Sequence, residues 1–520
     1  MKAVRYLAMG AAVSLAAIAP SALAQSQNPF TISDPMPTYE GVPEPYRVVT
    51  EHEMEIGGER IPYQAIAGET QLYDLAGNVT ASIFSFSYIR SDIDDPNRPV
   101  LFVFNGGPGS ASLWIHMGAI GPKQVILDKE VNPSNVPPFG IKSNGDSILD
   151  IADLVFIDPV GTGFSKALNG TDPRDFWGVD EDADSVAQFI ELWLSEYGRW
   201  NSPKYVLGES YGTIRASVLP SALMGSPFNP GVMRGITLDG IILLGTTLSA
   251  RPGEMPDEET AEAKAARLSL ALPGLAATSA YHGLSRGSMD AETAFTQSLA
   301  YAKGPYRDAL IKLEKDELSE EERAAVTEEL TGYIGLPAEL IGDDLYLSEN
   351  EYAKMVLARQ GLEIGKYDSR YTLPLANSGY DPVADDPAMG RYVPGFIASF
   401  NQMIRDDLHV DVKRPYTAIR WKDLLPSWNW ERNFPTRKPK SPAEELAWAL
   451  RRNQDLRVFV ASGYFDLVTT PANAMAQIEA GGVPLDRVRF EEYESGHMLY
   501  LGGTSEAFSN DLREFISAGR

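Results

Sequence analysis

The sequence contains no cysteine, few histidines and too little positive charge to balance its acids. Without cysteine, the chain of 520 residues has no disulfide bond, no thiolate metal site and no cysteine nucleophile. With only five histidines, a histidine-built metal centre is disfavoured, and we expect neither a metal nor a cofactor. The net charge of −26 would repel phosphate backbones, so we expect no nucleic-acid partner.

Long hydrophobic runs are also missing, apart from one short stretch near the N-terminus. There Lys2 and Arg5 precede the apolar run MGAAVSLAAIA, and small residues follow at Ala22 to Ala24. A basic start, a short apolar centre and a small-residue cleavage site are the pattern of a secretory signal peptide, and the run is too short to span a membrane comfortably. We therefore expect a signal peptide at 1–24, no stable membrane anchor, and a periplasmic or secreted bacterial protein.

The rest of the chain alternates between buried strands and helical patterns. The apolar segments PVLFVF, DLVFID, KYVLGE and GIILLG precede residue 250, and LRVFVASG and RVRFEEY follow residue 435. This alternation predicts an α/β domain with a mostly parallel sheet. Between these two groups of strands lie helical patterns that are rich in charged residues, and we interpret this segment as an insertion. We predict a core in two parts, 25–250 and 436–520, interrupted by a mainly helical cap insertion at 251–435.

A candidate nucleophile lies at the end of one predicted strand. Gly208-Glu209-Ser210-Tyr211-Gly212 follows KYVLGE, precedes a helix and fits the pattern Gly-x-Ser-x-Gly. In a strand–turn–helix context this pattern is the nucleophile elbow, which exposes the serine above the sheet. An ordinary strand–helix turn is the alternative, because glycine and serine are common. A serine nucleophile also needs a base, and the base needs an orienting acid.

The acid and the base are found after the last two predicted strands. Asp466 follows LRVFVASG and His497 follows RVRFEEY, in the chain order of serine, acid and histidine. Both lie at carboxyl ends of strands, where open α/β sheets bind ligands. Asp455 and Asp486 precede their strands and so belong to the opposite edge. We predict Ser210, Asp466 and His497 as a catalytic triad.

The oxyanion formed by serine attack requires preorganised N–H donors. One donor is normally the residue after the nucleophile, here Tyr211, and the second comes from a loop after an earlier strand. The segment Asn105-Gly106-Gly107-Pro108-Gly109 follows PVLFVF. Its glycines allow the backbone to approach a reacting oxygen closely, which makes this loop the candidate for the second donor.

Together these motifs resemble the serine carboxypeptidase family of the α/β-hydrolase superfamily. The matching segments, in the family's order, are FNGGPGS at 104–110, DPVGTGFS at 158–165, GESYG at 208–212, the turn at Asp466 and SGHM at 495–498. The resemblance implies an α/β-hydrolase fold with a central, mostly parallel sheet and a largely helical cap insertion. It also implies an exopeptidase that removes one residue from the C-terminus of a peptide through an acyl-enzyme.

The resemblance further assigns roles to residues around the nucleophile. Gly107 and Tyr211 would supply the oxyanion N–H groups, and Asn105, Gly106 and Glu209 would bind the substrate's C-terminal carboxylate. Glu209 can share a proton with that carboxylate only if one of the two is protonated, because two anions at hydrogen-bond distance repel. We therefore expect peptides with a free C-terminus as partners, and an activity favoured at mildly acidic pH.

Three positions depart from the family's pattern. Ser110 stands where a cysteine is usual, and Val103 where a tryptophan is frequent. Ala119 replaces a second glutamate that helps to hold the carboxylate in a Glu-x-Gly-Pro stretch. His116, one helical turn upstream, is open to two readings: a cationic donor that compensates for the missing glutamate, or a buried structural histidine.

Two other functions stay open. An esterase or acyltransferase can be built on the same scaffold, since a fold does not determine a function. A non-catalytic peptide-binding protein is the third possibility, and the complete set of Ser210, Asp466 and His497 argues against it.

Overall fold

The computed structural model describes four ranges of the chain, 44–228, 231–249, 259–432 and 439–518. The predicted signal peptide lies outside them, and so do both predicted ends of the cap insertion. Among the described residues, no helix combines the length and the apolar character needed to cross a bilayer.

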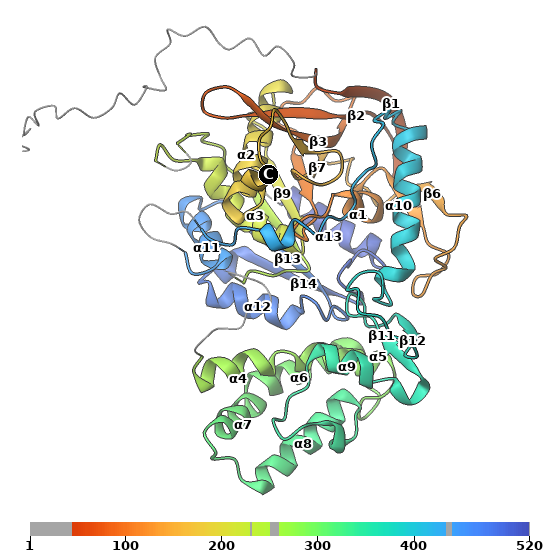
Figure 1. Cartoon of the computed structure of the whole chain (residues 1–520), viewed down its shortest axis with the longest axis vertical. Helices are drawn as coiled ribbons and strands as arrows, with labels where there is room; N and C mark the ends of the chain where they lie inside the picture. The colour runs from red at the N-terminus through yellow and green to blue at the C-terminus, as the bar shows by residue number, and fades with distance from the viewer. Residues whose placement is uncertain (1–43, 229–230, 250–258, 433–438, 519–520) are drawn as a thin grey trace, which may run out of the picture.

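The centre of the molecule is a twisted sheet that crosses the upper half of Figure 1. Within the described ranges it has ten strands, in the order β1-β2-β3-β7-β4-β9-β10-β13-β14 with β8 paired to β3. The strands are β1 (Arg47–Ile56), β2 (Glu59–Tyr73), β3 (Val79–Arg90), β4 (Val100–Phe104), β7 (Asp153–Asp158), β8 (Lys166–Ala167), β9 (Lys204–Glu209), β10 (Gly240–Leu244), β13 (Arg457–Gly463) and β14 (Val488–Tyr493).

One edge of this sheet is antiparallel and the rest is parallel. The pairs from β1 to β7 are antiparallel, whereas every pair from β7 to β14 is parallel. The six apolar segments singled out in the sequence form β4, β7, β9, β10, β13 and β14. The expected α/β-hydrolase fold with a mostly parallel central sheet is confirmed.

Helices cover both faces of the central part of the sheet, where strands such as β4 are buried on both sides. In β4, Leu101 and Val103 join one core cluster, and the alternate residues Val100, Phe102 and Phe104 join the other. The first cluster is completed by α1 (Leu113–Ile115), α10 (Met389–Asp406) and α13 (Ser505–Ser517). The second is completed by α2 (Val179–Glu196), α3 (Tyr211–Met224), α11 (Pro442–Arg452) and α12 (Pro471–Ala480).

A separate group of helices, drawn in green at the bottom of Figure 1, has a core of its own. It comprises α4 (Ala261–Ser269), α5 (Leu272–Tyr281), α6 (Ala291–Lys303), α7 (Pro305–Glu314), α8 (Glu320–Ile334) and α9 (Glu349–Met355). This helical unit packs on the loop after β13, where Leu467 enters its core and Phe465 contacts its first helices. By contrast α10, which falls inside the predicted insertion, packs against the sheet.

Short pairs of strands complete the described structure. β5 (Lys123–Ile126) and β6 (Gly140–Ser143) form one antiparallel pair beside α10. β11 (Leu362–Ile364) and β12 (Thr372–Pro374) form another, between the helical unit and α10. The second pair positions residues of the site described next.

Candidate active site

Ser210 lies in a sharp turn between β9 and α3. Its φ of 60° is uncommon for a residue other than glycine, and its N–H donates to the Leu244 carbonyl at 2.9 Å. Gly208 is needed sterically, because a Cβ there would lie 2.1 Å from the carbonyl oxygen of Gly212, and a Cβ on Gly212 would lie 3.1 Å from the carbonyl oxygen of Phe104. This is the strand–turn–helix geometry of a nucleophile elbow, with the serine at the start of a helix.

The loops after β13 and β14 bring Asp466 and His497 together. Nδ1 of His497 donates to Oδ2 of Asp466 at 2.8 Å, and both side chains are buried. The other carboxylate oxygen, Oδ1, accepts the N–H groups of Val468 at 2.7 Å and Thr469 at 2.9 Å. The Thr469 hydroxyl also donates to Oδ2 at 2.6 Å. With its Nδ1 proton held in this way, the imidazole offers Nε2 as a base.

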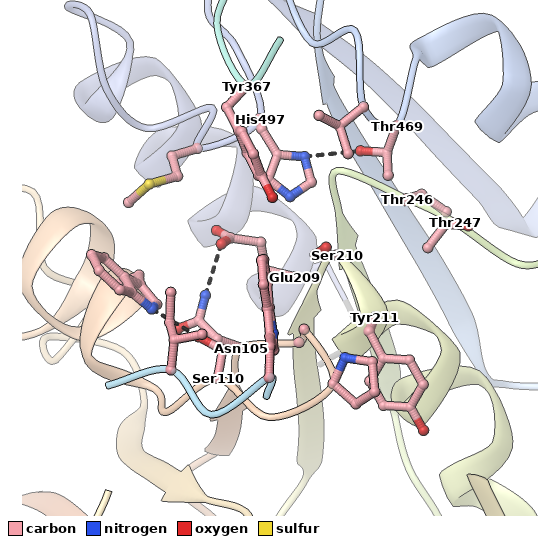
Figure 2. A pocket seen from close by; sticks show the side chains of 18 of the residues that line it. Asn105, Ser110, Glu209, Ser210, Tyr211, Thr246, Thr247, Tyr367, Thr469 and His497 are labelled. Carbon is pink, nitrogen blue, oxygen red and sulfur yellow. Dashed lines mark hydrogen bonds between the residues drawn. The ribbon is translucent and has the colours of Figure 1, made fainter. Parts of the chain in front are cut away.

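His497 and Ser210 line the same cavity, and in Figure 2 the imidazole of His497 lies on the side of the cavity opposite the glycine loop, facing Ser210. Burial by itself would lower the pKa of His497, but the Asp466 carboxylate outweighs it and the pKa lies above its usual value. Burial would likewise raise the pKa of Asp466, yet attraction to His497 and the hydrogen bonds hold it below its usual range. Asp466 is therefore a stable anion, and beside it His497 is more basic than a free imidazole. This arrangement suits the abstraction of a proton from a hydroxyl.

Glu209, next to the serine in sequence, is a buried carboxyl that also lines the cavity. Its Oε1 accepts a hydrogen bond from Nδ2 of Asn105 at 2.7 Å, drawn as a dashed line in Figure 2. Its Oε2 has no hydrogen bond of normal geometry within the described part of the chain, although the Tyr500 hydroxyl interacts with the carboxyl. Burial raises the pKa of Glu209 to about 7, against smaller opposing effects of His497, Tyr500 and Asn105.

The glycine loop after β4 packs directly against the elbow. A Cβ on Gly106 would lie 2.4 Å from the Tyr211 nitrogen and 2.5 Å from the Glu209 carbonyl oxygen. Gly107 has a φ of 106°, which favours glycine. Tyr211 begins α3, so its N–H has no acceptor within that helix. The loop and the elbow are therefore adjacent, as the predicted oxyanion donors Gly107 and Tyr211 require.

Substitution of Gly106 by alanine is expected to lower kcat/KM for a blocked dipeptide by about 10²-fold or more, because the added carbon forces the loop away from the elbow. Gly145→Ala is the matched control, since a Cβ at Gly145 would meet nothing within 4 Å. Steady-state kinetics of both variants, with thermal unfolding to compare their stability, measures the effect. A kcat/KM equal to that of the parent in Gly106→Ala would show that close approach is not needed.

The cavity has a volume of about 600 Å³, enough for a short peptide end. Its walls include Asn105, Gly106, Gly107, Glu209, Ser210, Tyr211 and His497. The cover comes from the later part of the predicted insertion, namely Tyr367, Met389, Ile419, Trp421, Leu425 and Trp430. Within the described ranges, the helical unit α4–α9 contributes no wall residue. The same ranges contain no group of three acidic or histidine side chains arranged to hold a metal ion.

The structure decides between the two readings of His116. The side chain is fully buried, stacks on Phe156 with ring centroids 4.1 Å apart, and bonds through Nε2 to the Tyr88 hydroxyl at 2.6 Å. Burial lowers its pKa to about 3, so it is neutral in mildly acidic and neutral solution. It does not line the cavity. The idea of a cationic donor is wrong, and His116 is a packing residue.

The ring of Tyr500 packs closely against the backbone next to Ala119. A Cβ on Gly118, next to Ala119, would lie 2.5 Å from Cε2 of Tyr500. Tyr500 is fully buried and interacts through its hydroxyl with Glu209. Glu209 is the one carboxyl among the residues that line the cavity in the described structure.

The predicted residues therefore converge, with Asp466 behind His497 and the other seven on the cavity wall. Sequence reasoning missed Thr469, Tyr367 and Tyr500. Thr469 lies three residues after Asp466 in the same turn, so its spacing was a usable signal. Tyr367 had none, because it lies far from the matching motifs in the sequence.

Comparison with known proteins finds a family match for one part of the chain. The family model described as serine carboxypeptidase matches residues 69–244. Serine carboxypeptidase-like 8 of Arabidopsis thaliana is 32% identical over 130 residues, which cover 25% of this chain and 28% of that protein. Serine carboxypeptidase-like 10 of the same plant is 30% identical over 158 residues, covering 29% of this chain and 33% of that protein. The chain thus matches about a third or less of the length of these relatives.

Solved structures give more distant matches over most of the chain. Proline iminopeptidase of Mycobacterium smegmatis has a TM-score of 0.36 at 14% identity, covering 90% of this chain and 98% of that one. A carboxyl esterase of Bacillus coagulans has a TM-score of 0.32 at 13% identity, covering 91% and 98%. The family match confirms the resemblance to serine carboxypeptidases over residues 69–244 and supports a serine hydrolase.

Proposed function

Starting from the serine carboxypeptidase match of residues 69–244, we propose that this protein is a serine-type carboxypeptidase. It removes the C-terminal residue of peptides through an acyl-enzyme on Ser210, and mildly acidic pH favours it. The observation that carries this proposal is the buried carboxyl of Glu209, which lines the cavity beside Ser210 with one oxygen lacking a hydrogen bond of normal geometry in the described chain.

The chemical step uses the triad and the oxyanion donors. Nε2 of His497 accepts the proton of the Ser210 hydroxyl while Oγ attacks the carbonyl carbon of the last peptide bond. The N–H groups of Gly107 and Tyr211 stabilise the oxyanion that forms. The C–N bond then breaks, and His497 gives its proton to the leaving amine. Water repeats the sequence on the acyl-enzyme and releases the shortened peptide.

The site for the substrate carboxylate consists of Asn105, Gly106 and Glu209. With a pKa of about 7, Glu209 is protonated in mildly acidic solution and can donate to an anionic carboxylate. As the pH rises through that pKa, Glu209 ionises and faces the substrate anion as a second negative charge. Binding of free-acid peptides should therefore weaken with rising pH, whereas peptides blocked as amides present no charge to Glu209.

We expect Glu209→Gln to flatten this pH dependence. KM of the parent for an N-blocked dipeptide with a free carboxylate should rise between about pH 6 and 8, because its carboxyl ionises there. KM of the variant should change little, because an amide of the same shape does not ionise. Glu363→Gln is the matched control: Glu363 is also a buried glutamate, bonded to Ser378 at 2.7 Å and absent from the cavity wall.

Two substrate types, the free acid and the C-terminal amide, decide between the candidate functions. Higher kcat/KM for the free acid, lost as Glu209 ionises, supports the carboxypeptidase. Equal or higher rates for amides or esters would favour the esterase alternative. Transfer of the acyl group to an added alcohol instead of water would favour the acyltransferase. Tight peptide binding without turnover would point to a non-catalytic binding protein. Identical pH dependence in parent and Glu209→Gln would remove the electrostatic support for the proposal.

The location of the protein stays a prediction. The periplasm or the exterior of a bacterial cell is proposed from the leader sequence at 1–24, which lies outside the described residues.

A further inference from the structure

The loop between β11 and β12, residues 365–371, lies against both loops that carry the catalytic pair. We call it the hairpin loop. The N–H of Ser369 donates to the Phe465 carbonyl at 3.0 Å, and the N–H of Leu467 donates to the Lys366 carbonyl at 2.9 Å. These two bonds hold the residues on either side of Asp466. The hairpin loop, although part of the insertion, thus fixes the backbone of the acid.

The same loop also holds the histidine. The N–H of His497 donates to the Tyr367 carbonyl at 2.6 Å. The Tyr367 ring meets the imidazole edge-on, with centroids 5.3 Å apart, and Figure 2 shows the two side chains together above the cavity. Packing is so close that a Cβ on Gly496 would lie 2.4 Å from the Tyr367 oxygen and 2.5 Å from Cβ of Asp368. We call residues 464–470, which include Asp466, the acid loop, and residues 494–504, which include His497, the histidine loop. The two loops therefore share one backbone support.

Arg370 connects this support to both loops through its side chain, which is 5% exposed. Its guanidinium bonds Asp368 through Nε at 2.9 Å and Nη2 at 2.6 Å. Nη1 donates to the carbonyl of Glu494 in the histidine loop at 2.6 Å. The guanidinium also lies over the ring of Phe465 in the acid loop, 5.1 Å from its centroid. Only a planar group with several donors can make these contacts at once.

The outer side of the hairpin loop is anchored to the insertion. The Thr278 and Ser369 hydroxyls lie 2.7 Å apart, and Nε2 of His282 lies 2.8 Å from the Ser369 carbonyl. Asp386, just before α10, accepts the N–H of Lys366 at 2.7 Å. Helix α5 and the start of α10 thereby keep the hairpin loop pressed against the catalytic loops.

We propose that Arg370 is a positioning residue for the Asp466–His497 pair. It does not touch the cavity. It fixes the separation of the acid loop and the histidine loop, and through them the hydrogen bond between Nδ1 and Oδ2. The inference rests on the proposed serine hydrolase function, and it gives the insertion a second role besides covering the cavity.

Loosening this support should change the basicity of His497 in a definite direction. The charged or titratable groups that face the imidazole are Asp466 from the acid loop, Glu209 from the elbow, Asp386 before α10 and Tyr367 from the hairpin loop. Burial lowers the pKa of His497, and Asp466 is the main group that raises it. A longer bond to Asp466 removes part of that attraction, so the pKa of His497 falls. The acid limb, meaning the decline in the reactivity of Ser210 at low pH as His497 becomes protonated, then moves to lower pH.

The test compares Arg370→Lys with Arg234→Lys by the rate of labelling with a fluorophosphonate, measured across pH. Lysine keeps the charge beside Asp368 but cannot bridge three groups. Arg234 is an equally buried arginine that bonds Glu191 at 3.0 Å and the Ala222 carbonyl at 3.1 Å, away from the site. Labelling needs no peptide substrate, so it reports on the triad separately from carboxypeptidase action.

For Arg370→Lys we expect labelling to slow by about 10- to 100-fold, as for a displacement of reacting groups of an ångström or less. Its acid limb should lie at lower pH than that of the parent. Arg234→Lys should label as the parent does, with thermal unfolding confirming that both variants are folded. Asp368→Asn, which weakens the anchor of the guanidinium and keeps its shape, should move both quantities in the same direction and serves if Arg370→Lys does not fold.

Parent-like labelling with an unchanged acid limb in Arg370→Lys would overturn the proposal, as would equal slowing in Arg234→Lys. Either result leaves the carboxypeptidase proposal intact. Failure of the parent itself to be labelled would overturn the proposed serine chemistry and this inference together.

Discussion

Ser210→Ala is expected to abolish peptide turnover, with a loss of kcat of about 10⁶-fold, because the members of a triad act as a unit. The fold should survive, since alanine removes a single oxygen and keeps the backbone N–H that donates to Leu244. Covalent labelling by a fluorophosphonate should disappear as well, because the reagent reacts with the activated hydroxyl itself. Mass spectrometry of the intact protein measures the adduct directly.

Ser249→Ala is the matched control for this experiment. Ser249 lines the same cavity, and its hydroxyl accepts a hydrogen bond from Gln477 at 3.1 Å rather than contacting the catalytic pair. This variant should be labelled at the rate of the parent. An adduct retained by Ser210→Ala would mean that another residue is the nucleophile, and the assignment of the elbow would fail.

Asp466→Asn is expected to reduce kcat by about 10⁴-fold, because it leaves His497 in the wrong tautomer. The reason lies in the four hydrogen bonds that the carboxylate accepts. Oδ1 faces the N–H groups of Val468 and Thr469, so an amide NH₂ cannot occupy that side. The asparagine must turn its NH₂ toward His497, which then accepts at Nδ1 and carries its proton on Nε2. In that tautomer the imidazole cannot take the proton from Ser210.

The control for this variant is a pair of exposed acids that precede β13 and β14, changed as Asp455→Asn and Asp486→Asn. Both should keep the activity of the parent, because they lie at the opposite edge of the sheet from the cavity. Steady-state kinetics and the low-field proton resonance of the His497 Nδ1–H bond measure the outcome. Near-parental kcat in Asp466→Asn, or a large loss in either control, would show that a different acid orients the histidine.

The nucleophile and its setting could be predicted because they depend on local sequence. Gly208 and Gly212 flank Ser210 within one turn, and the close contact that requires Gly208 is with Gly212, four positions away. The strands before Ser210 and Asp466 are mainly apolar and buried, as central parallel strands are, whereas the strand before His497 carries charged residues between apolar ones and is only partly buried. Once the strands are parallel, their carboxyl ends share an edge, so three residues distant in sequence had to approach one another.

The packing and the electrostatic environment of these residues could not be predicted from the sequence. Burial of Glu209, and with it a pKa raised to about 7, results from packing among segments far apart in the chain. His116 was ambiguous because a lone histidine carries no sign of its surroundings. Only its burial, which lowers its pKa, together with the stacked ring of Phe156 and the bond to Tyr88, identifies it as a neutral structural residue.

By itself the sequence determined the fold class, the chain order of the candidate triad and the glycine loops, because strand periodicity and turn chemistry are properties of neighbouring residues. Tertiary structure alone decided what covers the cavity and what supports the catalytic pair. Tyr367 contacts His497 through its backbone carbonyl, which any residue type possesses, and Arg370 reaches the loops of Asp466 and His497 through its guanidinium, each from about 100 residues or more away in sequence. Such contacts leave no pattern in side-chain order, since they depend on where an insertion folds back onto the sheet.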